Sequence, residues 1–312
     1  MRFVTVVEPE GLRAGLVVQD HVLLFPPRTS MLDLLGEPDG LLAAGDRVTR
    51  APAAVLRLDD ARLAAPVPRP PTVRDFMVFE SHVEGVSLLM GHGGTPVDEW
   101  YEAPVFYFTN PYAVVGPHDD VPVPPGCQVL DFELEVAAVI GRSGRDLSMT
   151  DAEDHIAGYV VMNDWSARDL QSAEMRTHLG PVKGKDTATT LGPALVTADE
   201  LAPYRRGETF DLGMTVSVNG ELIGGDRLTS MAWSFPAMVS YASRGTWVHP
   251  GDVLGSGTCG GGCLAELWGR AGRDAHPPLQ IGDVVTMTVE QIGTIRNVVV
   301  AGVAPLPVTR SR

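Results

Sequence analysis

The sequence is poor in cysteine. Cys127, Cys259 and Cys263 are the whole set in 312 residues, an odd and sparse number. A disulfide framework would need more cysteines, so we expect free thiols in a reducing compartment and a cytoplasmic location. The spacing of the three cysteines also matches no zinc-binding pattern.

Positive charge is scarce as well. Lys and Arg number 24 against 39 Asp and Glu, and the formal net charge is −15. We therefore expect no nucleic-acid partner, because phosphates need a basic surface. No apolar run is long enough to cross a membrane, and the first residues are typical of a short strand rather than a signal peptide, so we expect no membrane association. A local cation in a pocket would still allow an anionic small molecule to bind.

A proline-rich stretch divides the chain. With 44% hydrophobic and 20% charged residues, the composition is typical of a soluble globular protein. Four prolines within Pro66–Pro71 exclude a helix or a central strand there. We predict a small β-rich N-terminal domain over residues 1–68 and a catalytic domain over residues 69–312. Many short strands with glycine turns predict a mixed α/β, β-dominated fold in which the sheet is rolled or barrel-like.

One stretch carries the strongest chemical signal. Val129–Ile140 alternates at period two, which predicts a strand with Asp131, Glu133 and Glu135 on one face. Carboxylates about 7 Å apart on an otherwise apolar strand repel one another and resist burial. A bound cation would remove both problems. The commoner alternative is a half-exposed strand with a solvated acidic face.

A carboxylate metal site is the leading candidate. Glu133 and Glu135 would come from the acidic strand, Asp164 from the end of the buried strand Gly158–Asp164, and Asp75 from an earlier segment. All four offer hard oxygen ligands, which suit Mg²⁺, Mn²⁺ or Ca²⁺ better than Zn²⁺.

His82 is the candidate base. It lies in Val73–Glu84, whose apolar spacing predicts a helix. With a carboxylate to orient it, the imidazole could activate water, although a lone histidine is more often structural. Glu84 and Glu266 are the candidate orienting groups. Glu266 lies in the predicted strand Leu264–Leu267, where an isolated acid needs a partner.

Lys185 is the candidate cation of the site. Beside an acidic cluster it could pair with the ligands or stabilise a developing negative charge. Lys183 is expected to be an ordinary solvated lysine. Residues 83–103 contain a glycine-rich stretch that is either a flexible cover or a plain surface loop.

Gly255–Gly260 has the glycine spacing of a dinucleotide-binding loop. That motif requires a helix after the loop. The sequence predicts a short strand there, so we expect no dinucleotide site. No Gly-x-Ser-x-Gly elbow occurs, and an α/β-hydrolase serine mechanism has no support.

These motifs together resemble the fumarylacetoacetate hydrolase family. The resemblance covers about residues 72–300 and rests on four segments, of which the Asn-Asp-Trp-Ser-Ala-Arg-Asp run is the most specific. The segments are Asp131–Glu135, Met162–Gln171, Gly184-Lys185 and Gly257-Thr258. The Asp75-Phe76 pair followed by His82 resembles the fumarylacetoacetase branch. The resemblance implies a fumarylacetoacetase-like β-roll and a homodimer.

The resemblance also implies roles for individual residues. Metal ligands would be Glu133, Glu135, Asp164 and Asp75. His82 would be the water-activating base held by Glu266, and Lys185 would stabilise the leaving group. Substrate contacts would come from Tyr107, Gln171, Arg168 and Thr258. Asp131 matches no ligand position of the family and is expected either to support the ligands from behind or to be structural.

Three departures from the family pattern leave the substrate open. Met77 and Met175 stand where fumarylacetoacetase has tyrosines, and no arginine occurs near Gly91 to match its substrate-binding arginine. We predict a Mg²⁺-type hydrolase that cleaves a carbon–carbon bond in a small 1,3-diketo or acylpyruvate-like acid. A 2-oxo-acid decarboxylase, isomerase or dehydratase of the same family is the alternative, and a catalytically silent metal-binding protein is a further one.

Overall fold

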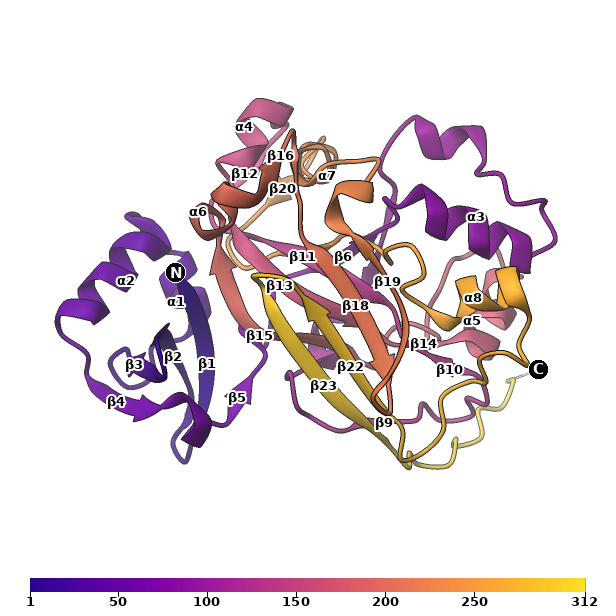
Figure 1. The fold of residues 1–312 in the computed structure, drawn as a ribbon, viewed down its shortest axis with the longest axis horizontal. Helices are drawn as coiled ribbons and strands as arrows, with labels where there is room; N and C mark the ends of the chain where they lie inside the picture. The colour runs from indigo at the N-terminus through magenta and orange to yellow at the C-terminus, as the bar shows by residue number, and fades with distance from the viewer. Residues whose placement is uncertain (312) are drawn as a thin grey trace.

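The large sheet of the fold joins strands from the start of the chain to its last third. The computed structural model describes residues 1–311 (Figure 1). Neighbouring strands along this sheet are β4 (Ala54–Arg57), β3 (His21–Leu24), β2 (Gly11–Val18), β1 (Arg2–Glu8), β15 (Thr189–Thr197), β13 (Ile156–Asp164), β11 (Leu134–Ile140), β21 (Val253–Gly255), β6 (Val73–Phe76) and β7 (Phe106–Thr109). Beside this row, β5 (Leu63–Ala64) pairs with β1 and β8 (Val114–Val115) pairs with β15. Segments distant in sequence thereby become neighbours.

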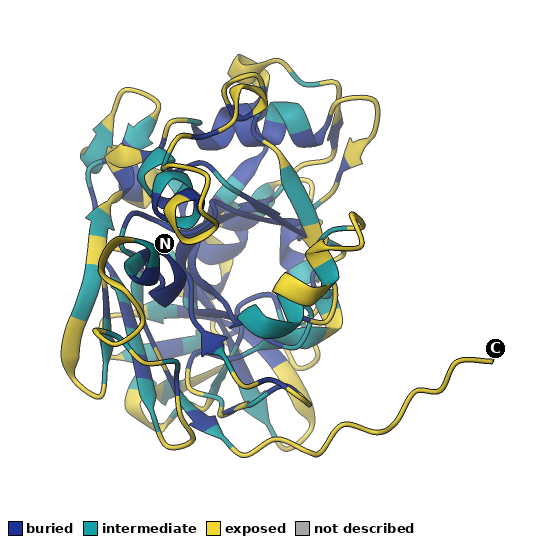
Figure 2. Ribbon diagram, turned by 90° about the vertical axis from the view of Figure 1, so that its right-hand side faces the viewer, coloured by how far each residue is buried: buried dark blue, intermediate teal, exposed yellow. Residues whose placement is uncertain are grey.

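A second sheet packs against the first. Its strands are β19 (Glu221–Arg227), β18 (Gly213–Val218), β22 (Val284–Val289), β23 (Gly293–Val300) and β9 (Val121–Pro122). Short pairs form between β10 (Leu130–Asp131) and β14 (Ser166–Ala167), β12 (Gly144–Arg145) and β20 (Trp247–Val248), and β16 (Arg205–Arg206) and β17 (Thr209–Phe210). The largest hydrophobic cluster takes Val136 and Val161 from one sheet and Val216 and Met287 from the other. The main core therefore lies between the sheets, and Figure 2 shows buried strands at the centre of the molecule.

Helices are short and lie among the strands. Within the described residues the α-helices are α1 (Met31–Leu35), α2 (Gly40–Arg50), α3 (Glu80–Leu89), α4 (Met149–Glu153), α5 (Arg168–Met175), α6 (Ala198–Leu201), α7 (Phe235–Ala242) and α8 (Leu264–Ala271). The predicted mixed α/β, β-dominated fold is confirmed. In residues 1–311, no helix has the length and apolar character required to cross a membrane.

The N-terminal segment continues the large sheet. β1 pairs with β15, where Arg2 lies opposite Val196 and Phe3 opposite Leu195. Phe3 belongs to a hydrophobic cluster that also contains residues of α1, α2, β11 and β15. In Figure 1 this indigo segment lies at one end of the molecule, with β1 beside β15. The division into domains at residues 68 and 69 stays a prediction.

The segment Val73–Glu84, predicted as one helix, is a strand followed by a helix. β6 ends at Phe76 and α3 begins at Glu80. β6 pairs with β21 on one side and with β7 on the other, and all its residues are buried. The predicted helix is therefore confirmed from Glu80 onward and wrong for Val73–Phe76, where a strand buried on both faces shows no alternation.

The predicted strand Leu264–Leu267 was also wrong, because these residues begin helix α8. Cys263 is the N-cap residue, and its Sγ accepts a hydrogen bond from the backbone N–H of Glu266. Leu264, Ala265 and Trp268 are buried on the inner face, a spacing typical of a helix. Four residues are too few to distinguish a buried strand from a helix by periodicity.

The acidic stretch Val129–Ile140 is interrupted rather than continuous. β10 ends at Asp131 and β11 begins at Leu134. Asp131 and Glu135 are fully buried and Glu133 is 4% exposed. The alternative of a solvated acidic face is therefore wrong.

Two glycines allow α3 and α8 to cross at close range. A Cβ on Gly269 would lie 2.1 Å from the carbonyl oxygen of Gly85, and a Cβ on Gly85 would lie 2.2 Å from Glu266 Cγ. Neither distance is possible for real atoms, so the crossing requires glycine at both positions. This crossing fixes the position of His82 on α3 relative to Glu266 on α8.

We expect Gly269→Ala to lower the free energy of unfolding by about 2 kcal/mol, because the added methyl group pushes the helices apart. Denaturant unfolding measures the change. Ala271→Ser, at an exposed position of the same helix, is the control and should change stability by less than about 0.5 kcal/mol. Equal stability of the two variants would contradict the crossing.

Candidate metal centre

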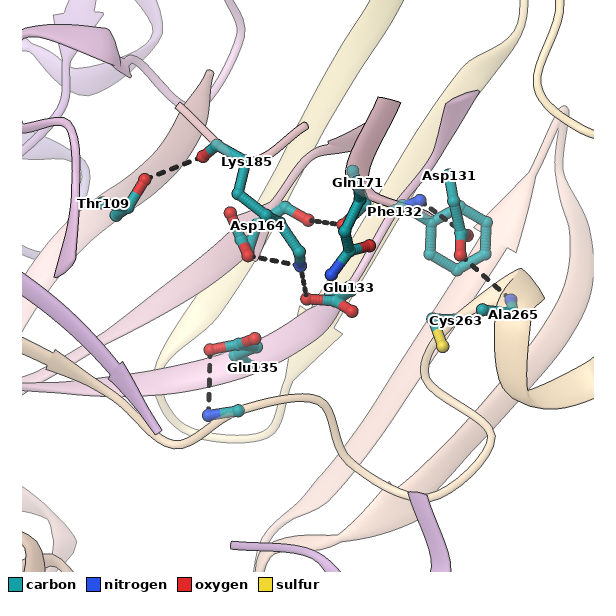
Figure 3. Close-up of polar contacts among 12 residues, drawn as sticks. Thr109, Asp131, Phe132, Glu133, Glu135, Asp164, Gln171, Lys185, Cys263 and Ala265 are labelled. Carbon is teal, nitrogen blue, oxygen red and sulfur yellow. Dashed lines mark hydrogen bonds and ion pairs between the residues drawn. The ribbon is translucent and has the colours of Figure 1, made fainter. Parts of the chain in front are cut away.

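Four carboxylates gather where β6, β11 and β13 lie together. Glu133 precedes β11, Glu135 lies on it, Asp164 ends β13 and Asp75 lies on β6. Carboxylate oxygens of Asp75, Glu133 and Glu135 lie within 4.8 Å of one another. Asp164 is linked to this group by Lys185, whose ammonium group donates to both Asp164 and Glu133, as Figure 3 shows. The fold thus brings together all four predicted metal ligands and the predicted cation.

Gly255 leaves room for this gathering. It lies opposite Asp75 in the parallel pair of β21 with β6, while β21 also pairs with β11. A Cβ at this position would lie 2.7 Å from Asp75 Oδ1 and 2.8 Å from Glu135 Oε2. The next loop contributes as well, because the backbone N–H of Gly257 donates to Glu135 Oε2 at 3.1 Å. No local pattern in the sequence indicates this role for Gly255 or Gly257.

Two basic side chains compensate part of the negative charge. Lys185 Nζ donates to Glu133 Oε2 and, at 2.6 Å, to Asp164 Oδ2. Arg168 Nη2 donates to Glu133 Oε1 at 2.7 Å. Burial favours a raised pKa for Glu133, yet Lys185 and Arg168 outweigh it and hold the pKa below its usual range. Glu133 is therefore ionised at neutral pH.

The other three carboxylates are compensated less well. Burial raises the pKa of Asp164 to about 6, although Lys185 opposes the shift. Burial, together with the charge of Asp164, raises the pKa of Asp75 well above its usual range. Burial and the charge of Asp75 do the same to the pKa of Glu135. Without a further cation, these three carboxyl groups keep their protons at pH values at which free carboxylic acids are ionised.

Several buried oxygens of the cluster have no hydrogen-bond partner. Asp75 Oδ1, Glu135 Oε1 and Asp164 Oδ1 are in this state. Buried polar atoms are nearly always bonded, so such a concentration requires an explanation. A divalent cation supplies one, since hard ions such as Mg²⁺, Mn²⁺ and Ca²⁺ bind carboxylate oxygens. The residues present therefore fit a divalent metal ion.

The predicted base lies beside a carboxylate. His82 Nδ1 is 3.4 Å from Glu266 Oε2, and both side chains are buried. Glu266, rather than Glu84, is the acid that the fold brings to His82. Glu266 also accepts from the backbone N–H of Gly261 at 2.8 Å and pairs with Arg270 Nη2 at 3.0 Å. Arg270, which the sequence analysis missed, lies one helical turn after Glu266 on α8.

Asp131 connects the acidic stretch to α8. Its Oδ1 accepts from the backbone N–H of Leu264 at 2.8 Å, and its Oδ2 accepts from Ala265 N at 2.9 Å and from Arg168 Nε at 2.8 Å. The close-up in Figure 3 includes the contact with Ala265. The N-terminal N–H groups of α8 are thus already bonded, so this helix cannot offer them to a phosphate. A helix does follow the glycine loop, against our expectation.

The predicted substrate contacts border the cluster. The Tyr107 hydroxyl donates to Asp164 Oδ2, and Arg168 Nη1 donates to Gln171 Oε1 at 3.1 Å. Thr258 is buried in the loop after Gly257. Their contact with a substrate stays a prediction.

Comparison with known proteins supports the resemblance. A sequence model of the fumarylacetoacetate (FAA) hydrolase C-terminal domain matches residues 72–300. The mitochondrial oxaloacetate tautomerase FAHD2A of Homo sapiens is 32% identical over 276 residues, which cover 88% of this chain and 80% of that protein.

Solved structures show the same fold. The fumarylacetoacetate hydrolase of Exiguobacterium antarcticum has a TM-score of 0.71 and 28% identity, with 97% of this chain and 100% of that chain covered. The maleylpyruvate hydrolase of a Sphingobium species, solved with manganese(II) and pyruvate, has a TM-score of 0.72 and 24% identity over the same shares. At that identity the second likeness shows the fold alone.

Metal-free protein should lose stability as the pH rises. A raised carboxyl pKa means that the folded state holds the proton more tightly than the unfolded chain, so stability is greatest at low pH and falls as pH rises through the folded pKa. For Asp164 that pKa is about 6. In chelator-treated protein we expect the melting temperature to fall as pH rises from about 4 to about 6. Added Mn²⁺ should remove most of the fall, and a pH-independent melting temperature without metal would contradict the account.

Asp131→Asn should lower the free energy of unfolding by about 3 kcal/mol, because the amide nitrogen cannot accept the bonds that Asp131 accepts and Arg168 loses a charged partner. Denaturant unfolding in the presence of Mn²⁺ measures this loss. The control is Asp59→Asn, at a side chain that is 84% exposed, where we expect less than about 0.5 kcal/mol. Similar losses in both variants would refute a connecting role for Asp131.

Proposed function

Because this chain belongs to the fumarylacetoacetate hydrolase family, we propose that it is a divalent-metal-dependent enzyme that hydrolyses a carbon–carbon bond in a small 1,3-diketo or acylpyruvate-like acid. One observation carries the proposal: a buried His82–Glu266 pair lies close enough to a buried carboxylate cluster for the charge of His82 to act on Glu133, and the cluster fits a metal ion. Hydrolysis needs an activated water molecule and a polarised carbonyl group. The His82–Glu266 pair can activate the water, and a metal ion held by the carboxylates would polarise the carbonyl.

The metal would be held by Asp75, Glu133, Glu135 and Asp164. When bound, it supplies Lewis-acid polarisation of the substrate carbonyl oxygens. We propose Mg²⁺ as the physiological ion, while Mn²⁺ and Ca²⁺ suit the same oxygen donors. The maleylpyruvate hydrolase of the Sphingobium species, which shares this fold, was solved with manganese(II).

His82 takes a proton from water in this proposal. Glu266 Oε2 lies 3.4 Å from His82 Nδ1, and its negative charge favours the proton on Nδ1, which leaves Nε2 free as the basic nitrogen. Arg270 and the backbone N–H of Gly261 fix the carboxylate, so the ring has one orientation. The water then adds to the carbonyl carbon, the bond to the leaving fragment breaks, and His82 can return the proton to that fragment.

Lys185 would stabilise the negative charge that develops on the leaving fragment. Its backbone is fixed by Thr109, whose hydroxyl donates to the Lys185 carbonyl oxygen at 2.8 Å. Tyr107, Gln171, Arg168 and Thr258 are the proposed substrate contacts. Arg168 already binds two carboxylates, so we propose that it positions Glu133 as well.

A tautomerase is the second candidate. The human relative is named an oxaloacetate tautomerase, and tautomerisation moves a proton on a 2-oxo acid without breaking a carbon–carbon bond. Decarboxylation and dehydration of 2-oxo acids remain further alternatives within the family, and a silent metal-binding protein is the alternative outside enzymes. The proposal also includes a homodimer and, given the free buried thiols of the described chain, a reducing cytoplasmic location.

Product analysis separates the candidates. Purified Mg²⁺-loaded protein should convert acylpyruvates to two acids, and a chelator should abolish the conversion. Incubation with oxaloacetate tests the rival, because a tautomerase changes the enol absorbance without forming two acids or CO₂. Tautomerisation alone would replace the hydrolase proposal, and turnover that persists in excess chelator would remove the metal from it.

His82→Asn should lower kcat by at least about 100-fold, because a general base contributes 10² or more to the rate. Mn²⁺ affinity, measured by calorimetry, should stay unchanged, since His82 is outside the carboxylate cluster. His92→Asn, in an exposed turn after α3, is the matched control and should keep wild-type kcat. Full activity of the His82 variant would contradict its role as the base.

A further inference from the structure

A second group of metal-binding side chains lies beside the carboxylate cluster. His82, Cys263 and Glu266 each present one ligand atom, these atoms lie within 4.8 Å of one another, and all three residues are buried. Cys263 Sγ is 3.7 Å from His82 Nδ1, and His82 Nδ1 is 3.4 Å from Glu266 Oε2. Nothing in the linear spacing of these residues indicates the group, because α3 and α8 bring them together.

The donor types of this group differ from those of the carboxylate cluster. One nitrogen, one sulfur and one oxygen atom suit Zn²⁺ and similar thiophilic dications, whereas an all-oxygen set suits Mg²⁺ and Mn²⁺. Three protein ligands also leave a fourth tetrahedral position for a water molecule.

We propose that His82, Cys263 and Glu266 form an inhibitory binding site for Zn²⁺ or a similar thiophilic dication, separate from the carboxylate metal centre. The binding step is a simple exchange: the S–H bond of Cys263 breaks, a bond from Sγ to the metal forms, and the proton leaves to the buffer.

The surroundings hold two of the three ligands in place. Cys263 is fixed as the N-cap of α8, and Glu266 is held by Gly261 and Arg270. The third ligand, His82, lies across the glycine crossing of α3 and α8. A preformed arrangement of this kind lowers the cost of ordering ligands around an ion.

Inhibition follows from the shared residue, and this consequence rests on the proposed function. A dication on His82 Nδ1 replaces the proton that the charge of Glu266 would hold on that nitrogen, and it places a positive charge on the imidazole that must take a proton from water. The enzyme would then need one class of metal and be inhibited by another.

Cd²⁺ provides a direct test, because its bond to a thiolate gives a charge-transfer band in the near ultraviolet. The probe is added to Mn²⁺-saturated protein, so that the oxygen site is already filled. We expect one equivalent of the band in the wild type and in Cys127→Ser, and none in Cys263→Ser. A band that persists in Cys263→Ser, or that disappears in Cys127→Ser, would overturn the site.

His82→Asn completes the binding test. The thiolate band should remain, but the affinity for Cd²⁺ should fall by at least about 100-fold, because changes outside the ligand shell alone cost 10- to 100-fold. Unchanged affinity would remove His82 from the site. Serine is a good N-cap, so Cys263→Ser should fold, and Cys263→Ala serves as a second variant if its melting temperature shows otherwise.

Zn²⁺ inhibition is measured with each variant's own zinc-free rate as the reference. The inhibition constant should rise by at least about 100-fold in Cys263→Ser and stay unchanged in Cys127→Ser. Equal inhibition of both variants would place the inhibitory ion elsewhere, for example at the carboxylates. The Cd²⁺ band is independent of turnover, so a failure of the proposed hydrolysis would leave the binding test intact.

Discussion

The burial of several carboxylates in one small volume is the constraint on which this structure depends. Desolvation and mutual repulsion both oppose ionisation of Asp75, Glu135 and Asp164. Lys185 and Arg168 compensate Glu133 most fully, which leaves a site with excess negative charge and unpartnered oxygens. A divalent cation is the simplest group that would balance the charge and bind the unpartnered oxygens.

The rest of the fold serves to keep this charge in place. β6, β11 and β13 are neighbours or near neighbours in one sheet, and Gly255 lets their acids approach. Asp131 connects the start of α8 to Arg168, and Arg168 in turn binds Glu133. The same α8 carries Glu266 to His82 across the glycine crossing. The metal centre and the base are therefore positioned by one continuous set of contacts. The thiol of Cys263 lies within the same set, beside the imidazole of His82.

The sequence predicted much of the site because period-two alternation and the family motifs identify residues by type and order. Glu133, Glu135 and Lys185 meet in the structure as those motifs implied. The local elements were harder. Glu266 was expected in a strand because a run of four residues, three of them apolar, fits either element. The segment around His82 was expected to be wholly helical because a strand buried on both faces has no alternation. The convergence of His82 with Cys263 depends on helix packing, which no local pattern encodes.

Anomalous diffraction is the measurement that tests the central claim most directly. Crystals grown with Mn²⁺ and measured at the manganese absorption edge would show where the ion binds without reference to activity. The account predicts a strong peak enclosed by the carboxylates of Asp75, Glu133, Glu135 and Asp164, with the Lys185 ammonium group beside it. Crystals soaked in Mn²⁺ with no peak among these carboxylates would contradict the account.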